Sequence, residues 1–196
     1  MRLINFLLLF FLSQSFNACK NEGEQEQEQV NSDSAAGDKE SRLKGYSNRF
    51  RNLIKTDQGV FRGIEFGMNR EDVKAMEDSL KTPDQTENDT LDYIINFNFP
   101  ETAEVLYYTG KDEKLSRIQV DIYPENIDSQ LELFKEFEKY FRSKYGKPVS
   151  SEDKNELQWK VSDQGLLIRL RKQGNDKVHD LQIDFTQIPV TSGIPS

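Results

Sequence analysis

Cysteine and histidine are almost absent from this 196-residue chain, which contains one of each, Cys19 and His179. A single cysteine cannot form an intramolecular disulfide, so we expect the hydrophobic core to hold the fold together even in an oxidising compartment. A single histidine excludes a metal site built on two histidines and acid–base catalysis by a histidine pair. We interpret His179 as a structural residue, because it shares a predicted strand phase with Leu181 and Ile183.

The chain also lacks an excess of positive charge. It contains 26 basic and 34 acidic residues, which gives a formal net charge of −8. Nucleic-acid binding requires a basic stripe that displaces counterions from phosphates, so we expect no nucleic acid among the partners. A partner with a basic surface would instead be attracted. Because the sequence has no Gly-x-Ser-x-Gly or phosphate-loop motif, we expect no enzyme, no cofactor and no bound metal.

No apolar run is long enough for a membrane-spanning helix, which needs about 20 residues. The longest mostly apolar run extends from Leu3 to Leu12 and follows the positively charged Arg2. A short apolar run after a positive charge, with a small residue such as Ala18 before the cut site, is typical of a secretory signal peptide. The sequence therefore predicts a signal peptide over residues 1–18.

Cys19 follows this segment directly. The ending Phe16-Asn17-Ala18-Cys19 resembles the lipobox of bacterial lipoproteins, with Phe16 in the place of the usual leucine. The resemblance implies that Cys19 is acylated and anchors the mature chain in a membrane, where each buried CH₂ contributes about 0.8 kcal/mol. We expect a lipid-anchored protein of the bacterial cell envelope, most simply in the outer membrane. The alternative is an ordinary cleaved signal peptide with a chance thiol.

Residues 19–45 contribute little to a hydrophobic core. Glutamate and glutamine alternate from Glu24 to Gln29, and Val30 is the one large apolar residue before Leu43. This composition cannot offset the entropy cost of ordering the backbone, so we expect a disordered acidic tether. An acidic stretch after the lipidated cysteine also resembles the surface-export signal of Bacteroidota lipoproteins, which implies display on the cell surface. A plain spacer in the periplasm is the alternative.

Residues 46–190 have the hydrophobic periodicity of one domain, and residues 191–196 form a short tail. Four apolar residues at helical spacing predict a short leading helix: Tyr46, Phe50, Leu53 and Ile54. The remainder shows a helix followed by three strands, twice, in units over residues 67–123 and 126–187. We therefore predict an α+β fold of two tandem α-βββ units, with an antiparallel sheet and helices packed on one face.

Apolar spacing, caps and turn residues predict the bounds of these elements. The first unit has a helix over 70–80 and strands over 91–99, 103–108 and 115–123. The second unit has a helix over 127–145 and strands over 156–161, 166–171 and 178–185. The long helix is predicted to bury one apolar stripe, with Phe137 beside it: Ile127, Leu131, Phe134, Phe141 and Tyr145.

The segment from Gly67 to Val73, Gly-Met-Asn-Arg-Glu-Asp-Val, resembles the helix-opening motif of small outer-membrane lipoproteins of the barrel-assembly accessory family. In that family a helical segment packs on a three-stranded sheet. Two tandem copies of such a unit make the fold type of the beta-lactamase inhibitor protein. The resemblance thus implies a tandem architecture and no particular function.

Two tyrosines, Tyr108 and Tyr123, fall on the strand face opposite the predicted core. Leu106 shares this alternation, and Arg169 and Arg171 flank the expected patch. Exposed patches with tyrosine and arginine are typical of binding sites, so these five residues are our candidate binding site. The alternative is that the leading helix covers this face.

Three functions are compatible with these features. The first, which we favour, is a monomeric, non-catalytic protein-binding module, either an envelope accessory factor or an inhibitor or immunity protein. The second is a carbohydrate-binding accessory lipoprotein, in which Tyr108 or Tyr123 would stack on a sugar. The third is a small hydrolase that uses a carboxylate pair such as Asp112 and Glu113, whose separation would decide the stereochemistry of glycoside hydrolysis.

Overall fold

The computed structural model describes residues 42–80, 85–87, 91–98, 100–174 and 178–190. The predicted signal peptide, the acylation of Cys19 and the tail at 191–196 lie outside these residues, as does most of the predicted tether. The described fold begins at Arg42, and Leu43 already packs against the core.

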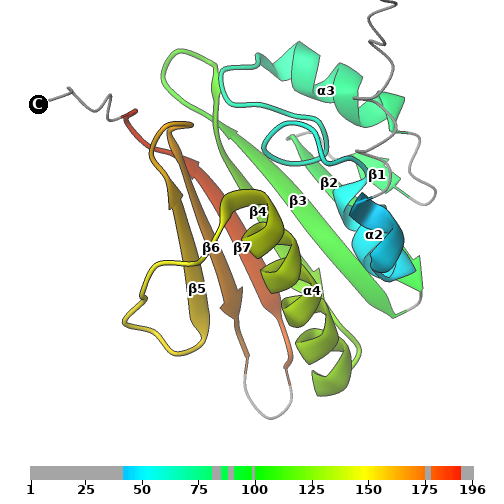
Figure 1. The fold of residues 1–196 in the computed structure, drawn as a ribbon. Coiled ribbons are helices and arrows are strands. Elements are labelled where there is room, and N and C mark those ends of the chain that lie inside the picture. The colour runs from blue at the N-terminus through cyan, green and yellow to red at the C-terminus, as the bar shows by residue number, and fades with distance from the viewer. Residues whose placement is uncertain (1–41, 81–84, 88–90, 99, 175–177, 191–196) are drawn as a thin grey trace, which may run out of the picture. The chain divides into compact units, whose positions relative to one another are not determined.

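Seven strands form one antiparallel sheet in the order β1-β2-β3-β4-β7-β6-β5 (Figure 1). The elements have these bounds: η1 (Leu43–Gly45), α2 (Asn48–Ile54), α3 (Arg70–Ser79), β1 (Gln85–Glu87), β2 (Asp92–Asn98), β3 (Glu101–Thr109), β4 (Leu115–Tyr123), α4 (Ile127–Tyr145), β5 (Glu156–Val161), β6 (Leu166–Lys172) and β7 (Leu181–Gln187). The predicted α+β class and the antiparallel sheet are confirmed. Four strands instead of three follow α3, because the short polar strand β1 pairs with the edge of β2.

Alternation along the strands separates an apolar inner face from a polar outer face. Along β3 every second side chain from Glu101 to Tyr107 is buried, and those between are half-buried. The inner face carries the apolar residues of the sheet: Tyr93, Ile95, Ala103, Val105, Tyr107, Ile118, Val120, Ile122, Trp159, Ile168, Leu170, Leu181, Ile183 and Phe185. These residues form one core cluster with the helices.

Helices α2 and α4 lie side by side on the inner face (Figure 1). The ring centroid of Phe50 in α2 lies 4.9 Å from that of Phe137 and 5.4 Å from that of Tyr140, both in α4. The leading helix therefore shares the inner face with α4. The alternative that it covers the outer face is wrong.

The buried stripe of α4 differs from the predicted one by about one position. Its buried residues are Gln130, Leu133, Phe137, Tyr140 and Phe141. Ile127 is 52% exposed, and the predicted Leu131, Phe134 and Tyr145 are half-buried. The stripe includes a polar residue because the Gln130 amide donates to the backbone oxygens of Gln173 and Asp180, at 3.1 and 2.7 Å. A prediction from apolar residues alone cannot include such a position.

Polar residues at the helix ends explain where α3 and α4 begin and end. The Asn69 side chain accepts a hydrogen bond from the Asp72 backbone N–H at 2.9 Å and so caps the start of α3. The Asn126 side chain accepts one from the Ser129 backbone N–H at 3.0 Å. Gly146 follows α4 with a φ of 85°, a conformation that favours glycine.

A fully buried ion pair attaches α3 to the rest of the fold. The Arg62 guanidinium donates to the Glu77 carboxylate at 2.8 and 2.9 Å and to the Leu53 backbone oxygen at 3.0 Å. The hydroxyl of Tyr107 in β3 donates to the same carboxylate. Both charged side chains are 0% exposed, so breaking the pair would leave an uncompensated buried charge.

Candidate functional site

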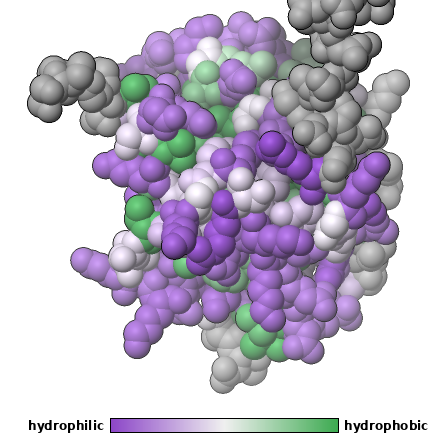
Figure 2. Space-filling model, in the orientation of Figure 1, coloured by the Kyte–Doolittle hydropathy of each residue, from purple (hydrophilic) through white to green (hydrophobic). Residues whose placement is uncertain are grey.

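Side chains of β2 to β7 that point away from the helices form what we call the open face, because no helix of the described residues covers it. It contains these residues: Asp92, Ile94, Glu104, Leu106, Tyr108, Arg117, Gln119, Asp121, Tyr123, Glu156, Gln158, Lys160, Leu167, Arg169, Arg171, Gln182, Asp184 and Thr186. The helix side, which faces the viewer in Figure 2, presents a mostly hydrophilic surface.

The strand register aligns open-face residues in rows across the sheet. The central row contains, in order from β2 to β5, Asp92, Leu106, Gln119, Asp184, Arg169 and Gln158. Neighbouring strands are about 4.8 Å apart, so this row spans about 24 Å and separates Leu106 from Arg169 by about 14 Å.

A hydrogen-bonded network of polar side chains occupies the centre of the open face. Arg117 donates to Asp184 at 2.8 and 3.0 Å and to Gln119 at 2.8 Å. Gln119 and Gln182 both donate to the Asp121 carboxylate, at 2.6 and 2.7 Å. The hydrogen bond to Asp184 raises the pKa of Arg117.

Sequence reasoning missed this network. The sequence does place charged and amide residues at outward positions of consecutive strands. Which of these side chains form hydrogen bonds with one another depends on the register between the strands. The network holds these side chains in place and makes the centre of the face polar.

The structure separates the two candidate tyrosines. Tyr123 lies opposite Thr102, which is six residues before Tyr108 on β3, so the tyrosines are about 20 Å apart along the strands. Their exposed fractions are similar, 38% for Tyr108 and 40% for Tyr123. The two tyrosines are therefore not neighbours, although both side chains lie on the predicted face.

Each tyrosine has its own polar partner. The Arg117 guanidinium carbon lies 5.0 Å from the centroid of the Tyr108 ring, within cation–π range. The Tyr123 hydroxyl donates to Glu104 at 3.5 Å, and burial, followed by the nearby Asp121 and Glu104 carboxylates, raises its pKa. Leu106 is half-buried on the same strand as Tyr108, two residues away. Leu106, Tyr108 and Arg117 thus form one compact group.

The two candidate arginines have different surroundings. Arg171 donates to Glu156 on the neighbouring strand at 2.5 Å. Burial opposes ionisation of Glu156, but hydrogen bonds from Gln158, Arg171 and Ser151 outweigh it and lower the pKa. Arg169 has no hydrogen-bond or ion-pair partner within the described ranges, although Asp184 is directly opposite. Its guanidinium N–H groups are available to a ligand.

Charge is unevenly distributed across the open face. Strands β5 and β6 contribute Lys160, Arg169 and Arg171 against one acid, Glu156, whereas β2 and β3 contribute Asp92 and Glu104. The face is therefore basic towards one edge of the sheet and acidic towards the other. Such polarity favours one orientation of a docked partner.

The remaining candidates lie away from the open face. Asp112 and Glu113 are exposed in the turn between β3 and β4, where the Asp112 carboxylate accepts a hydrogen bond from the Lys114 backbone N–H at 3.2 Å. His179 is half-buried and precedes β7, which begins at Leu181. The predicted strand began three residues too early: its regular pairing with β6 begins at Leu181, and the Asp180 backbone oxygen accepts from the Gln173 backbone N–H and the Gln130 side chain.

The described ranges contain no group of three or more histidine, cysteine, aspartate or glutamate residues that could hold a metal ion. None of the helices described combines the length and apolar character that crossing a bilayer requires.

Comparison with known proteins assigns no family. No family model and no curated protein matches the chain. A solved structure, that of a DUF4309 family protein (YjgB) from Bacillus subtilis subsp. subtilis str. 168, is similar over 70% of this chain and 95% of its own. The identity is 15% and the TM-score 0.35, which is too low to assign a shared fold.

Proposed function

We propose that this protein is a lipid-anchored module of the bacterial envelope that binds a partner protein through the open face. The observation that supports this most directly is the group formed by Leu106, Tyr108 and Arg117 on a sheet face that no described helix covers. Tyrosine and arginine are enriched among the residues that dominate binding energy at protein interfaces.

The dimensions of the open face favour a macromolecular partner. It extends about 24 Å across the strands and about 20 Å along them, which approaches the scale of one side of a standard protein interface of about 800 Å². Small ligands are usually bound in concave sites that enclose them. A sheet face with a fixed polar network resembles the polar surroundings of a protein interface more closely than it resembles such a pocket.

The proposed location in the cell envelope is inferred from the sequence of the first 45 residues. Acylation of Cys19 would leave 22 residues between the anchor and Arg42, where the described fold begins. A fully extended segment of that length spans at most about 80 Å. The domain could therefore meet a partner well above the membrane, either on the cell surface or in the periplasm.

The tandem architecture is a further part of the proposal. Strands β2, β3 and β4 are neighbours in that order in one half of the sheet, and β5, β6 and β7 are neighbours in that order in the other half. The two halves meet where β4 pairs with β7. This arrangement supports two related halves. The extra strand β1 and the place of α2 beside α4 distinguish the halves.

A carbohydrate partner is the second candidate, and one observation supports it. Tyr123 is 40% exposed and its hydroxyl lies 3.5 Å from Glu104, so a ring surface and a hydrogen-bond acceptor occur together. Stacking on Tyr123 would bind a sugar at the end of the face that is distant from Leu106 and Tyr108. The two candidates therefore predict different sensitive residues.

Crosslinking in native cells followed by affinity purification tests the proposal. We expect one stoichiometric protein partner that is lost with the double variant Leu106→Ala/Tyr108→Ala and retained with Lys135→Ala, a matched change on the exposed side of α4. Thermal unfolding of both variants confirms that they fold. Retention of the partner by the double variant would contradict the proposal, and loss of glycan binding with Tyr123→Ala alone would favour carbohydrate.

A further inference from the structure

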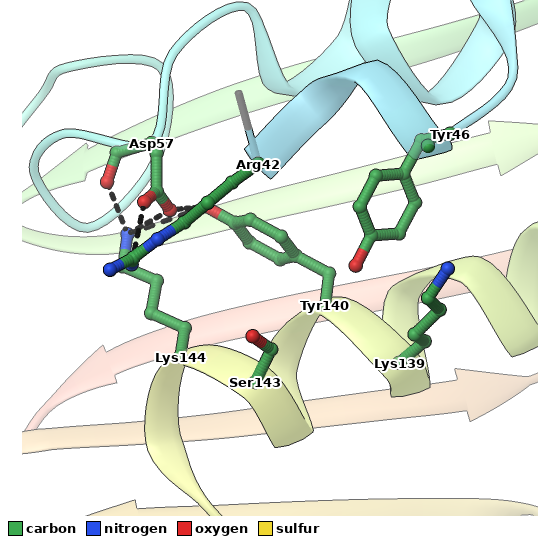
Figure 3. Close-up of a pocket in the computed structure, with 8 residues that line it drawn as sticks. Arg42, Tyr46, Asp57, Lys139, Tyr140, Ser143 and Lys144 are labelled. Carbon is green, nitrogen blue, oxygen red and sulfur yellow. Dashed lines mark hydrogen bonds and ion pairs between the residues drawn. The ribbon is translucent and has the colours of Figure 1, made fainter. Parts of the chain in front are cut away.

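A hollow lies on the helix side of the molecule, between α4 and the start of the described chain (Figure 3). Its volume is about 240 Å³. These residues line it: Arg42, Gly45, Tyr46, Asp57, Lys139, Tyr140, Ser143 and Lys144. We call it the helix pocket.

One part of the helix pocket is already saturated with hydrogen bonds. The Asp57 carboxylate, whose side chain is 6% exposed, accepts from the Tyr140 hydroxyl at 2.8 Å and from Arg42 at 3.1 Å. The Lys144 ammonium donates to the backbone oxygens of Asp57 and Gly59 at 2.9 and 3.0 Å. Burial lowers the pKa of Lys144 and raises that of Tyr140. These groups tie the loop after α2 to α4 and form a rigid wall.

The other part of the helix pocket presents free donors. Lys139 lies over the Tyr46 ring, 4.9 Å from its centroid, and has no carboxylate partner among the residues described. The Ser143 hydroxyl likewise has no hydrogen-bond partner within those ranges. Among the described residues, Arg42 donates only through Nη1, to Asp57, and its remaining N–H groups have no partner there. Figure 3 shows Lys139, Ser143 and Tyr46 around the same hollow.

The local charge of the helix pocket is opposite to that of the chain. Arg42, Lys139 and Lys144 contribute three positive charges and Asp57 one negative charge, a formal sum of +2 in a protein whose net charge is −8. A phosphate monoester carries a charge of about −1.5 to −2 at pH 7 and has three acceptor oxygens. Its charge and acceptors match the free cations and hydroxyl of the pocket.

Tyr46 adds an apolar wall to this cationic site. Its ring stacks on Phe50 with a centroid distance of 4.4 Å, so its orientation is fixed by the core. The volume is near the lower limit of about 300 Å³ for ligand pockets, which limits the occupant to a small molecule or a headgroup. We propose that the helix pocket binds a phosphate monoester with a small organic substituent, through Lys139, Ser143 and Arg42.

Calorimetric titration of the purified protein with phenyl phosphate tests this site. Because a hydrogen bond to a charged group contributes about 1.5–3 kcal/mol, we expect Lys139→Gln to weaken binding at least about tenfold, and Ser143→Ala to weaken it by a smaller factor. Lys135→Gln, the same charge change one turn earlier on α4, should leave the affinity within about twofold. Lys144 is unsuitable as a test because its bonds hold the fold.

Further titrations distinguish the source of the phosphate group. Inorganic phosphate probes the anion alone, and vesicles that contain phosphatidic acid probe a lipid headgroup. Preference for phenyl phosphate over both supports a small soluble ester, and preference for the vesicles, still lost with Lys139→Gln, supports a lipid. Absence of binding to all three, or equal weakening by Lys135→Gln and Lys139→Gln, would overturn the proposal. The partner crosslink at the open face is independent of either result.

Discussion

The two faces of the sheet differ in composition and in what covers them, although the same strands form both. The inner face buries a mainly apolar set of side chains beneath α2 and α4, together with the paired charges of Arg62 and Glu77. The open face places Arg117, Asp184 and Asp121 in a hydrogen-bonded network in which Arg117 is exposed and Asp184 is buried beneath its neighbours, with no described helix over it. The comparison indicates that burial on the inner face supplies most of the stability. Side chains on the open face can therefore contact a partner.

Two ion pairs, one on each side of the sheet, differ in exposure in the same way. Arg62 and Glu77 are fully buried in the core, whereas the Arg117 side chain on the open face is 39% exposed. Water can solvate an exposed guanidinium that loses its partner, but it cannot reach a buried one. If the faces differ as described, substitutions of similar chemistry should have unequal effects on the two faces.

The largest expected effect is at the centre of the inner face. Phe137 is 0% exposed and its ring contacts those of Phe50 and Phe141, so Phe137→Ala leaves a cavity and should lower the free energy of unfolding by about 4 kcal/mol. Phe134→Ala, three residues earlier on the same helix, should cost much less because Phe134 is half-buried. Urea denaturation measures both. Equal losses would contradict the observed stripe of α4.

Removal of the buried arginine should have the next largest effect. Arg62→Leu leaves the Glu77 carboxylate without its ion-pair partner and should cost about 3 kcal/mol, near the lower end for buried pairs, because the Tyr107 hydroxyl still donates to it. The double variant Arg62→Leu/Glu77→Leu should be less destabilised than the sum of the single variants. A loss below about 1 kcal/mol for Arg62→Leu would contradict the assigned role.

The matched change on the open face should be much smaller. Asp184→Asn removes the carboxylate of this pair and leaves the Arg117 guanidinium, whose side chain is 39% exposed, to be solvated by water, so we expect a loss of about 1 kcal/mol or less. Denaturation at low and high salt measures this loss. A loss as large as that of Arg62→Leu would remove the distinction between the two faces.

The smallest predicted effect concerns pH. Hydrogen bonds lower the pKa of Glu156 in the folded protein below the usual 4.5. As pH falls, the unfolded chain takes up this proton first, so the contribution of Glu156 to stability is present above pH 4.5 and is lost below it. Glu156→Gln should therefore flatten the acid limb of the stability curve, and Glu152→Gln, an exposed control, should not. An unchanged slope with Glu156→Gln would contradict this assignment.

Much of the fold could be predicted from local patterns. The predicted bounds of β4, α4 and β5 coincide with those observed, because caps, turns and alternation act over a few residues. β1 could not be predicted, since Gln85–Glu87 contains no apolar residue and becomes a strand by pairing with β2. Gln130 and Glu77 are polar residues at buried helix positions, and only tertiary hydrogen bonds explain them.

The candidate site could be predicted only in part. Alternation alone assigned Leu106, Tyr108 and Tyr123 to the correct face, because successive strand residues point to opposite sides. Which of them are neighbours depends on the register between strands, and the register places Tyr123 about 20 Å from Tyr108. The helix pocket joins residues that are far apart in the sequence, Arg42 and Lys139 among them, so no local pattern could indicate it.

The most direct test of the account is photocrosslinking from the open face in native cells. A photoreactive amino acid replaces Leu106 in one variant and Lys135, on the exposed side of α4, in another. We expect a single protein adduct from position 106 and none from position 135. Adducts from position 135 alone, or the same adducts from both positions, would contradict the claim that the open face binds the partner.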